Sequence, residues 1–287
     1  MGVATALLIR PRAALVLGRV SNLPTVVSNA LAGLILAGAP AEGLPLVLAA
    51  LVPFYLGGMY LNDAFDAKID ARERPGRPIP SGTATRQAVF AAGFLLMGAG
   101  LAVTIASGAE PAGLALFAAI LIYDAVHKHT VLAPVIMGLC RLLCYVSAAV
   151  MLAGQLDRPA LILGALGLSA HVVGLTYAAR QEAYDRLEAA WPLAVLAVPL
   201  AWALWSALGN PVALALWIGL AAATGCGLRL LFRRAPGDVP RAVGLLIAAI
   251  SLYDAVLIAG TGSVAMALVA AACFPATLAL HRVVPGT

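Results

Sequence analysis

Three aspartates in one short stretch, Asp63, Asp66 and Asp70, are the residues of this chain best suited to metal or phosphate chemistry. Their i, i+3 and i+7 spacing places the three carboxylates on one face of a helix, within about two turns. Such a patch is unfavourable by itself at the C-terminal end of a helix, because like charges repel and acids meet the negative end of the helix dipole. We therefore expect a positive partner for these acids.

Magnesium fits this requirement, because Mg²⁺ prefers hard oxygen ligands, binds through one or two carboxylates and shares its remaining positions with water and substrate phosphates. A diphosphate is the natural complement of such a metal site. Basic side chains within and after the acids are suited to contact its oxygens, and these are Lys68, Arg72, Arg74 and Arg77. The alternative interpretation is a solvated loop of mixed charge.

Residues 62–82 resemble the UbiA superfamily of intramembrane prenyltransferases. The family's first motif is Asn-Asp-x-x-Asp-x-x-x-Asp, and it is matched by Asn62, Asp63, Asp66 and Asp70. The segment that follows, Arg77-Pro78-Ile79-Pro80-Ser81-Gly82, matches the family's Arg-Pro-Leu-Pro-Ser-Gly with one conservative change. The resemblance implies that the three aspartates are catalytic and hold Mg²⁺. It also implies substrate-binding roles for Asn62, Lys68, Arg72 and Arg77.

The composition is that of an integral membrane protein. Of the 287 residues, 62% are hydrophobic and only 11% are charged, and the mean hydropathy is +0.98. The net charge of +5 does not indicate nucleic-acid binding, because the basic residues are scattered between apolar segments rather than gathered on one soluble face. The four cysteines all lie in apolar segments and carry no metal-binding spacing. We expect a single domain over residues 1–287.

The apolar runs predict an all-α bundle of nine to ten transmembrane helices around a central cavity. A spanning helix needs roughly 17 to 25 residues. Ten runs approach that length, at 13–38, 44–67, 86–107, 111–126, 131–153, 159–179, 191–208, 211–231, 241–260 and 264–282. Nine helices are more usual in the resembled family. Basic residues fall in alternate connections, so the positive-inside rule places the N-terminus and the acidic site on the cytoplasmic side.

A second polar stretch, residues 176–188, lies at the end of the sixth apolar run. Glu182 and Asp185 stand at i, i+3, a spacing that suits a second Mg²⁺, with Tyr177 and Arg180 as expected substrate contacts. The resembled family places two or three aspartates here, whereas the i, i+3 pair of this chain is one Glu and one Asp. Two interpretations stay open, a second metal site and a charge cluster at a helix end.

Further polar residues are candidates for the substrate pocket. The segment from Tyr123 to Thr130 resembles the family's Tyr followed by Lys-Arg, which implies that Tyr123 and Lys128 bind the substrate. An ordinary positive-inside lysine is the alternative for Lys128. Asn22 on the first helix either lines the cavity, as the resemblance implies, or forms hydrogen bonds between helices.

Two charges fall near the bilayer midplane, Arg141 and Asp254, where an unpaired charge costs at least a few kcal/mol. We expect them to face the interior as an ion pair, with Arg141 also binding substrate. Residues 22–25 and Arg141 resemble the divergent Ebo-type subgroup of the family.

The resemblance implies Mg²⁺-dependent transfer of a prenyl group from an isoprenoid diphosphate to a lipophilic, aromatic or otherwise electron-rich acceptor within the lipid membrane. A different class of function, isoprenoid or lipid binding without transfer, stays open because the second acidic stretch is reduced. Terpene cyclisation uses the same first motif. CDP-alcohol phosphotransferases are excluded, because their pattern requires Gly after the second Asp, where this chain has Ala67.

Overall fold

The fold is a bundle of helices in a computed structural model that describes residues 8–154, 156–180 and 191–286. No β-strand occurs among these residues. The first half contains α1 (Pro11–Leu17), η2 (Val20–Asn22), α2 (Leu23–Ala37), η3 (Ala41–Gly43), α3 (Leu44–Glu73), α4 (Arg86–Ala106), α5 (Glu110–Val126) and α6 (Ala133–Ala153). The second half contains α7 (Pro159–Arg180), η5 (Trp191–Leu196), α8 (Ala197–Ala207), α9 (Pro211–Arg233), α10 (Asp238–Gly260) and α11 (Val264–His281).

The predicted membrane bundle is confirmed, with one correction at its start. Within the described residues, eight helices are long and apolar enough to cross a membrane, while α5 and α8 are shorter. The segment predicted as one helix over 13–38 is broken, because α1 ends at Leu17 and Arg19 adopts a left-handed conformation with φ of 39°. A left-handed residue cannot continue a right-handed helix, so the chain re-enters through the short turn η2 before α2.

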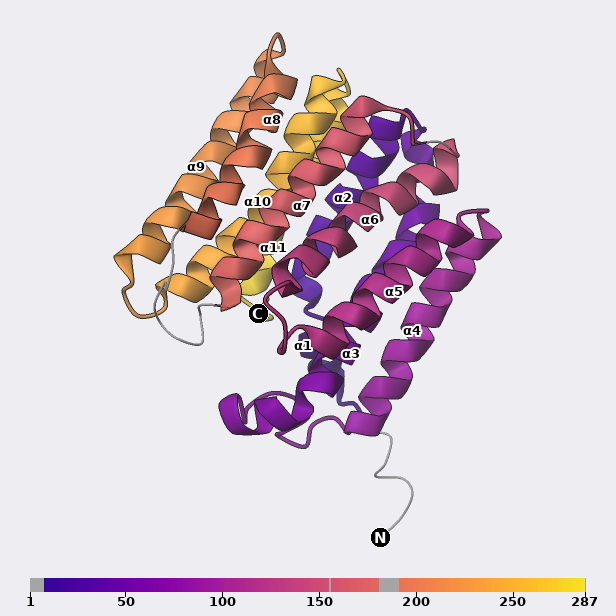
Figure 1. Ribbon diagram of the computed structural model, residues 1–287, viewed down its shortest axis with the longest axis vertical. Coiled ribbons are helices and arrows are strands. Elements are labelled where there is room, and N and C mark those ends of the chain that lie inside the picture. The colour runs from indigo at the N-terminus through magenta and orange to yellow at the C-terminus, as the bar shows by residue number, and fades with distance from the viewer. Residues whose placement is uncertain (1–7, 155, 181–190, 287) are drawn as a thin grey trace.

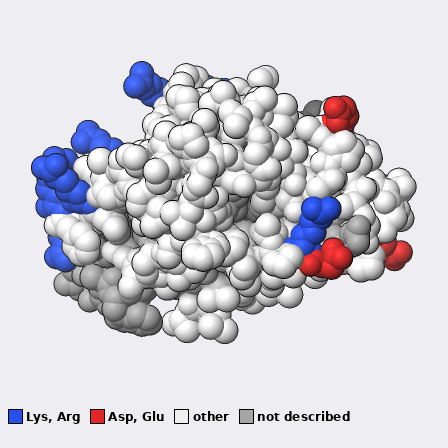
Figure 2. Space-filling model, turned by 90° about the horizontal axis from the view of Figure 1, so that it is seen from above, with Lys and Arg blue, Asp and Glu red and all other residues white. Residues whose placement is uncertain are grey.

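The helices run up and down, so that successive connections alternate between the two ends of the bundle (Figure 1). The α2–α3, α4–α5, α8–α9 and α10–α11 connections lie at the upper end in that view, and α3–α4, α5–α6 and α9–α10 lie at the lower end. Seen from above, most of the surface is uncharged, with Lys and Arg side chains gathered at the left edge and a few Asp and Glu side chains on the right, beside a further basic group (Figure 2). The acidic motif at the end of α3 lies at the lower end, where the α3–α4 and α9–α10 connections carry several arginines (Figure 1).

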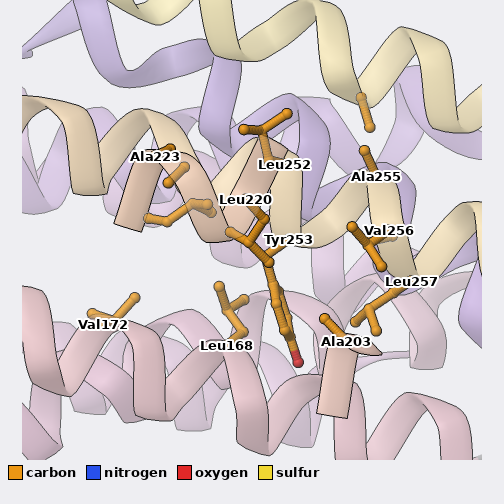
Figure 3. Packing of buried hydrophobic residues seen from close by; sticks show 14 of the residues in the cluster. Leu168, Val172, Ala203, Leu220, Ala223, Leu252, Tyr253, Ala255, Val256 and Leu257 are labelled. Carbon is orange, nitrogen blue, oxygen red and sulfur yellow. The ribbon is translucent and has the colours of Figure 1, made fainter. Parts of the chain in front are cut away.

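Two helices form the centre of the bundle. Buried residues make up 72% of the α2 span and 78% of the α10 span, against 22% for α11 and 28% for α9. The hydrophobic core of the second half gathers around α10, whose side chains meet those of α7, α8 and α9 (Figure 3). Tyr253 of α10 points toward α7 and donates a hydrogen bond to the carbonyl oxygen of Gly164 at 2.9 Å. Polar groups on these central helices must therefore find their hydrogen-bond partners inside the protein.

The two midplane charges do not form the direct ion pair that the sequence predicted. Arg141 of α6 donates to the Asn29 Oδ1 atom at 2.7 Å, and Asn29 donates through Nδ2 to the Asp254 Oδ2 atom at 2.8 Å. Tyr145 donates to the other oxygen of Asp254. The prediction was wrong because it paired the charges directly, whereas an amide of α2, with both a donor and an acceptor, lies between them.

Helices α3 and α4 pack with their backbones close together, because glycines face each other across the contact. A Cβ atom placed on Gly57 meets the Gly93 carbonyl oxygen at 2.8 Å and the Met97 backbone nitrogen at 2.9 Å. Small residues allow such an approach in membranes, where packing rather than hydrophobic burial drives helix association. The contact fixes α3, the helix that carries the three aspartates.

Substituting Gly57→Ala should lower the free energy of unfolding by about 1–3 kcal/mol, because the added methyl group meets backbone atoms that cannot turn aside. Gly98→Ala is the matched control on α4, since a Cβ atom there has nothing within 4 Å. Thermal unfolding in detergent micelles measures both variants. An unchanged Gly57→Ala protein would contradict this packing.

Substituting Asn29→Ala should lower the free energy of unfolding by about 1–3 kcal/mol, because Arg141 and Asp254 each lose a buried partner. Thr277→Val is the control, as the Thr277 hydroxyl is buried but bonds only the Cys273 carbonyl oxygen of its own helix. The same unfolding measurement should show a loss below about 1 kcal/mol for the control. Equal losses in the two variants would argue against a bridging role for Asn29.

Candidate active site

The acid row, defined as Asp63, Asp66 and Asp70, lies on one buried face of the last turns of α3. The three side chains belong to residues that are only 4%, 7% and 3% exposed. Helix α3 has 30 residues and is about 45 Å long, well above the roughly 30 Å of a bilayer's hydrocarbon core. The predicted placement on one helical face is confirmed, and the length of α3 brings the acid row to the end of the bundle.

Arginines from two other segments neutralise Asp63. Arg19 Nη2 lies 3.1 Å from the Asp63 Oδ1 atom, and Arg77 Nη1 lies 2.8 Å from the same oxygen. Arg77 Nη1 also lies 3.8 Å from Asp70 Oδ2. Burial lowers the pKa of Arg77 from its usual value, because desolvation disfavours the charged form, yet an arginine remains protonated at neutral pH. The expected positive partners of the acid row are therefore present.

Arg19 reaches the acid row because the first helix is interrupted. Its left-handed backbone conformation is unusual for a residue with a side chain and is the kind of local strain found at functional sites. The Tyr55 hydroxyl donates to the Arg19 carbonyl oxygen at 3.1 Å and helps to hold this turn against α3. Arg19 stands out in the sequence as a charged residue inside the first apolar run, and the resembled family often contributes an Arg from its first helix to the pocket. The break in that helix, which directs Arg19 to Asp63, was not predicted.

Asp66 is paired with residues from the end of α5. The His127 Nε2 atom lies 3.1 Å from Asp66 Oδ2, and Lys128 Nζ lies 3.6 Å from the same oxygen. The other His127 nitrogen, Nδ1, lies 3.2 Å from the Tyr123 carbonyl oxygen, so each ring nitrogen has an oxygen within hydrogen-bond distance. The Tyr123 ring stacks on His127 with centroids 4.9 Å apart. The structure thus brings Lys128 to Asp66 and Tyr123 to His127, while substrate binding by Tyr123 and Lys128 stays a prediction. His127 is a neighbour of the acid row that sequence analysis did not name.

A cavity of about 270 Å³ opens beside the acid row, and we call it the polar cavity because half of its lining residues are charged. Its wall combines one acid with several basic side chains and backbone of the α3–α4 loop, and its lining residues are Val16, Arg19, Asp63, Arg74, Gly76, Arg77, Pro78 and Pro285. A cavity with two partly buried guanidinium groups is suited to an anion such as a phosphate. The cavity therefore lies where the sequence predicted a diphosphate.

Two predicted substrate contacts, Lys68 and Arg72, are not brought to this cavity. Because each residue turns a helix by about 100°, they lie roughly 140° and 180° around α3 from Asp63. Both residues are exposed. The structure places them on the face of α3 opposite the acid row, where solvated basic residues of a membrane protein are common.

A second cavity, of about 80 Å³, lies between α2, α3, α5 and α6. Its lining is largely apolar, with Val26, Leu51, Phe54, Leu116 and Ile120 among its residues. Its polar members are Tyr55, Tyr123, Asp124 and Arg141, together with Cys140 and Cys144. Arg141 thus faces this apolar cavity, as its predicted role in substrate binding requires, and two of the four cysteines pack in the wall.

A chain of hydrogen bonds connects the two cavities. Asp124 Oδ1 accepts from Asn62 Nδ2 at 3.2 Å, and Asn62 Oδ1 accepts from Arg19 Nη2 at 3.3 Å. The same Arg19 nitrogen contacts Asp63, so four side chains lead from the apolar cavity to the polar one. Asn62, predicted to bind substrate, has the central position in this chain. A molecule with a polar head and an apolar tail finds complementary surfaces at its two ends.

Asn22 does not line either cavity. Its Nδ2 atom donates to the Gly286 carbonyl oxygen at 3.0 Å, and its Oδ1 atom contacts His281 Nε2 at 2.7 Å. Of the two alternatives, the structure shows hydrogen bonding between distant segments, because the C-terminal segment returns to the start of α2. The predicted role of Asn22 in substrate binding is therefore replaced by a structural role, in which Asn22 holds the C-terminal segment.

The second polar stretch lies largely outside the described residues. Glu182 and Asp185 belong to that part, so their predicted metal binding stays a prediction. Arg180 is the last residue of α7. Tyr177 packs, partly buried, against the hydrophobic core of the second half and is not a lining residue of either cavity described above.

The donor chemistry of the acid row suits Mg²⁺, although the described side chains form no ready-made cluster of three or more metal ligands. Magnesium needs only one or two carboxylates when phosphate oxygens supply other positions. Both guanidinium groups approach the Asp63 Oδ1 atom, and no described residue donates to Oδ2. Asp63, which lines the polar cavity, is therefore the carboxylate best placed to share a metal with a phosphate, with Asp66 and Asp70 beside it.

Known proteins share both the sequence pattern and the fold. Digeranylgeranylglyceryl phosphate synthase of Methanoregula boonei is 40% identical over 89 residues, which cover 31% of this chain and 32% of the relative. The enzyme of the same name from Methanopyrus kandleri is 39% identical over 98 residues, covering 33% and 36%. The matched regions thus span about a third of these relatives.

A solved structure concerned with digeranylgeranylglyceryl phosphate synthase in membranes superposes with a TM-score of 0.59 at 16% identity, covering 87% of this chain and 97% of that one. At this identity the likeness shows a shared fold. The sequence model of the UbiA prenyltransferase family matches residues 26–258, which include all three aspartates of the acid row and both cavity-connecting residues Asn62 and Asp124. The chain belongs to the UbiA prenyltransferase family.

Proposed function

We propose that this protein transfers a prenyl group from an isoprenoid diphosphate to a lipophilic acceptor within the membrane. The observation that carries the proposal is the pair of cavities, one lined by Asp63, Arg19 and Arg77 and the other largely apolar, joined through Asn62. An isoprenoid diphosphate has the same two parts, an anionic head and a hydrocarbon tail. The family and the names of the relatives support the same reaction class.

The polar cavity is the proposed site of the diphosphate. Arg19 and Arg77 provide guanidinium donors for the phosphate oxygens, and Lys128 lies on the other side of the acid row. The acid row holds Mg²⁺, which when bound supplies charge stabilisation to the departing diphosphate. In the free protein the same basic groups neutralise the acids, so the site is held in place before substrate arrives.

The apolar cavity is the proposed site of the reacting end of the chain. Its side chains from α2, α3, α5 and α6 exclude water from an allylic cation, which water would otherwise capture. The cavity is small, so a long tail must extend between these helices toward lipid. The reaction therefore takes place inside the bundle, next to the end that carries the basic connections.

The acceptor belongs to one of two chemical classes. An aromatic or otherwise electron-rich lipid is expected from the resemblance, and the names of the relatives indicate a prenylated glyceryl phosphate. The basic residues of the sequence fall mainly in the connections at the active-site end, which by the positive-inside rule indicates that this end faces the cytoplasm.

Binding of an isoprenoid lipid without transfer is the second candidate. The observation that favours it is the reduced acidic stretch at 176–188, where Asp185 is the single aspartate in place of two or three. It predicts stabilisation by a prenyl diphosphate with no turnover.

The purified protein in detergent with Mg²⁺ and geranylgeranyl diphosphate should transfer the prenyl group to at least one acceptor from a panel of aromatic lipids and prenylated glyceryl phosphates. Asp63→Ala and Asp66→Ala should lower the rate by at least about 100-fold, because each removes a carboxylate from the metal-diphosphate site. Chelation of Mg²⁺ should have a similar effect. Asp157→Ala, an exposed acid at the opposite end of the bundle, is the control and should retain the wild-type rate.

Turnover that survives both substitutions in the acid row would contradict the proposed role of these residues. Stabilisation of the protein by geranylgeranyl diphosphate, with no product from any acceptor, would favour the binding protein instead.

A further inference from the structure

We propose that Asp124 accepts the proton of a hydroxyl group on the acceptor, so that the acceptor is an alcohol or phenol prenylated on oxygen. This inference rests on the proposed prenyl transfer and specifies its second substrate. It assigns a catalytic role to a residue that lies outside the acid row, on α5, and that the sequence motifs do not mark.

Asp124 is a buried carboxylate with an incomplete set of hydrogen bonds. The residue is 3% exposed, its Oδ1 atom accepts from Asn62, and its Oδ2 atom has no partner among the described residues. Buried polar atoms of native proteins are nearly always hydrogen-bonded, so an Asp oxygen buried without a partner calls for an explanation. A bound ligand with a hydroxyl group supplies the hydrogen bond that Asp124 Oδ2 lacks.

Asp124 differs in kind from the other buried polar groups that lack a partner. Within the described part of the chain those groups are neutral, and they are the hydroxyls of Ser21, Ser147 and Thr224 and the indole nitrogen of Trp202. None of these four residues lines either cavity, whereas Asp124 is in the wall of the apolar one. Among these five unpaired atoms, Asp124 Oδ2 is therefore the one that belongs to a residue in a cavity wall, where a ligand can approach it.

The position of Asp124 relative to the leaving group suits proton transfer. Asn62, which binds Asp124 Oδ1 at 3.2 Å, directly precedes Asp63, and its own Oδ1 atom accepts from Arg19 in the polar cavity. A prenyl diphosphate held by Arg19 and Asp63 thus has its first carbon near the junction of the two cavities. An acceptor hydroxyl that donates to Asp124 meets that carbon from the apolar side.

The reaction step is balanced without a further reactant. The bond from the first prenyl carbon to the diphosphate oxygen breaks, and its electron pair leaves with the diphosphate. A lone pair of the acceptor oxygen forms the new carbon–oxygen bond, and the hydroxyl proton passes to Asp124 Oδ2. Product release then returns the proton to water.

The Asp124→Asn variant tests this role, because asparagine keeps the Oδ1 atom that accepts from Asn62 and loses only the accepting Oδ2 atom. With the acceptor found by the panel assay, the variant should transfer the prenyl group at least about 100-fold more slowly than wild type. Its stabilisation by Mg²⁺ and geranylgeranyl diphosphate, measured by thermal shift without acceptor, should remain. Asp63→Asn should lose both, since it removes a ligand of the diphosphate site.

The methyl ether of the same acceptor provides a test on the wild-type protein that does not depend on how any variant folds. Blocking the hydroxyl should abolish product formation. Equal prenylation of the ether, or normal transfer by Asp124→Asn, would overturn the inference and leave the proposed prenyl transfer standing. Loss of donor stabilisation in Asp124→Asn would also overturn it, by showing a structural role. Absence of transfer by wild type to every acceptor would instead refute the proposed function itself.

Discussion

The structure depends on the burial of three like charges at the end of a membrane helix. Asp63, Asp66 and Asp70 repel one another and are nearly inaccessible to water, so an arrangement without positive partners would be strongly unfavourable. The protein meets this constraint with basic side chains from three separate places, namely the turn after α1, the loop after α3 and the end of α5. Each of these segments must therefore fold against the end of α3.

This constraint explains features that otherwise look unrelated. The first membrane segment is interrupted at Arg19, which loses helical continuity but brings a guanidinium to Asp63. The glycine contact between α3 and α4 fixes the helix that carries the acids and the start of the loop that carries Arg77. Because Arg19 contacts both Asp63 and Asn62, the neutralised acid row is also joined to the apolar cavity and to Asp124.

Local spacing was sufficient to predict the features that depend on one helix. The single face of the acid row, the apolar helices and the alternation of basic connections all follow from residue order along the chain. The same periodicity shows that Lys68 and Arg72 lie on the opposite face of α3, which grouping them by nearness in sequence overlooked. Tyr123 and Lys128 were found through their resemblance to a family motif, and the structure brings both to Asp66 or its partner His127.

Features that depend on contacts between distant segments were not predictable in this way. Asn22 meets the C-terminal segment 264 residues later, and Asn29 lies between two charges that the sequence paired directly. Asp124 looked like part of a polar loop, since its significance comes from a missing partner in a cavity formed by four helices. Such information exists only once the helices are packed.

A structure of the protein with Mg²⁺ and a non-hydrolysable geranylgeranyl diphosphate analogue tests the central claim most directly. The account predicts the diphosphate in the polar cavity, in contact with Arg19 and Arg77, with a metal between it and Asp63 and the first prenyl carbon at the mouth of the apolar cavity. A diphosphate bound elsewhere, with the acid row still paired only to its own basic side chains, would contradict the account.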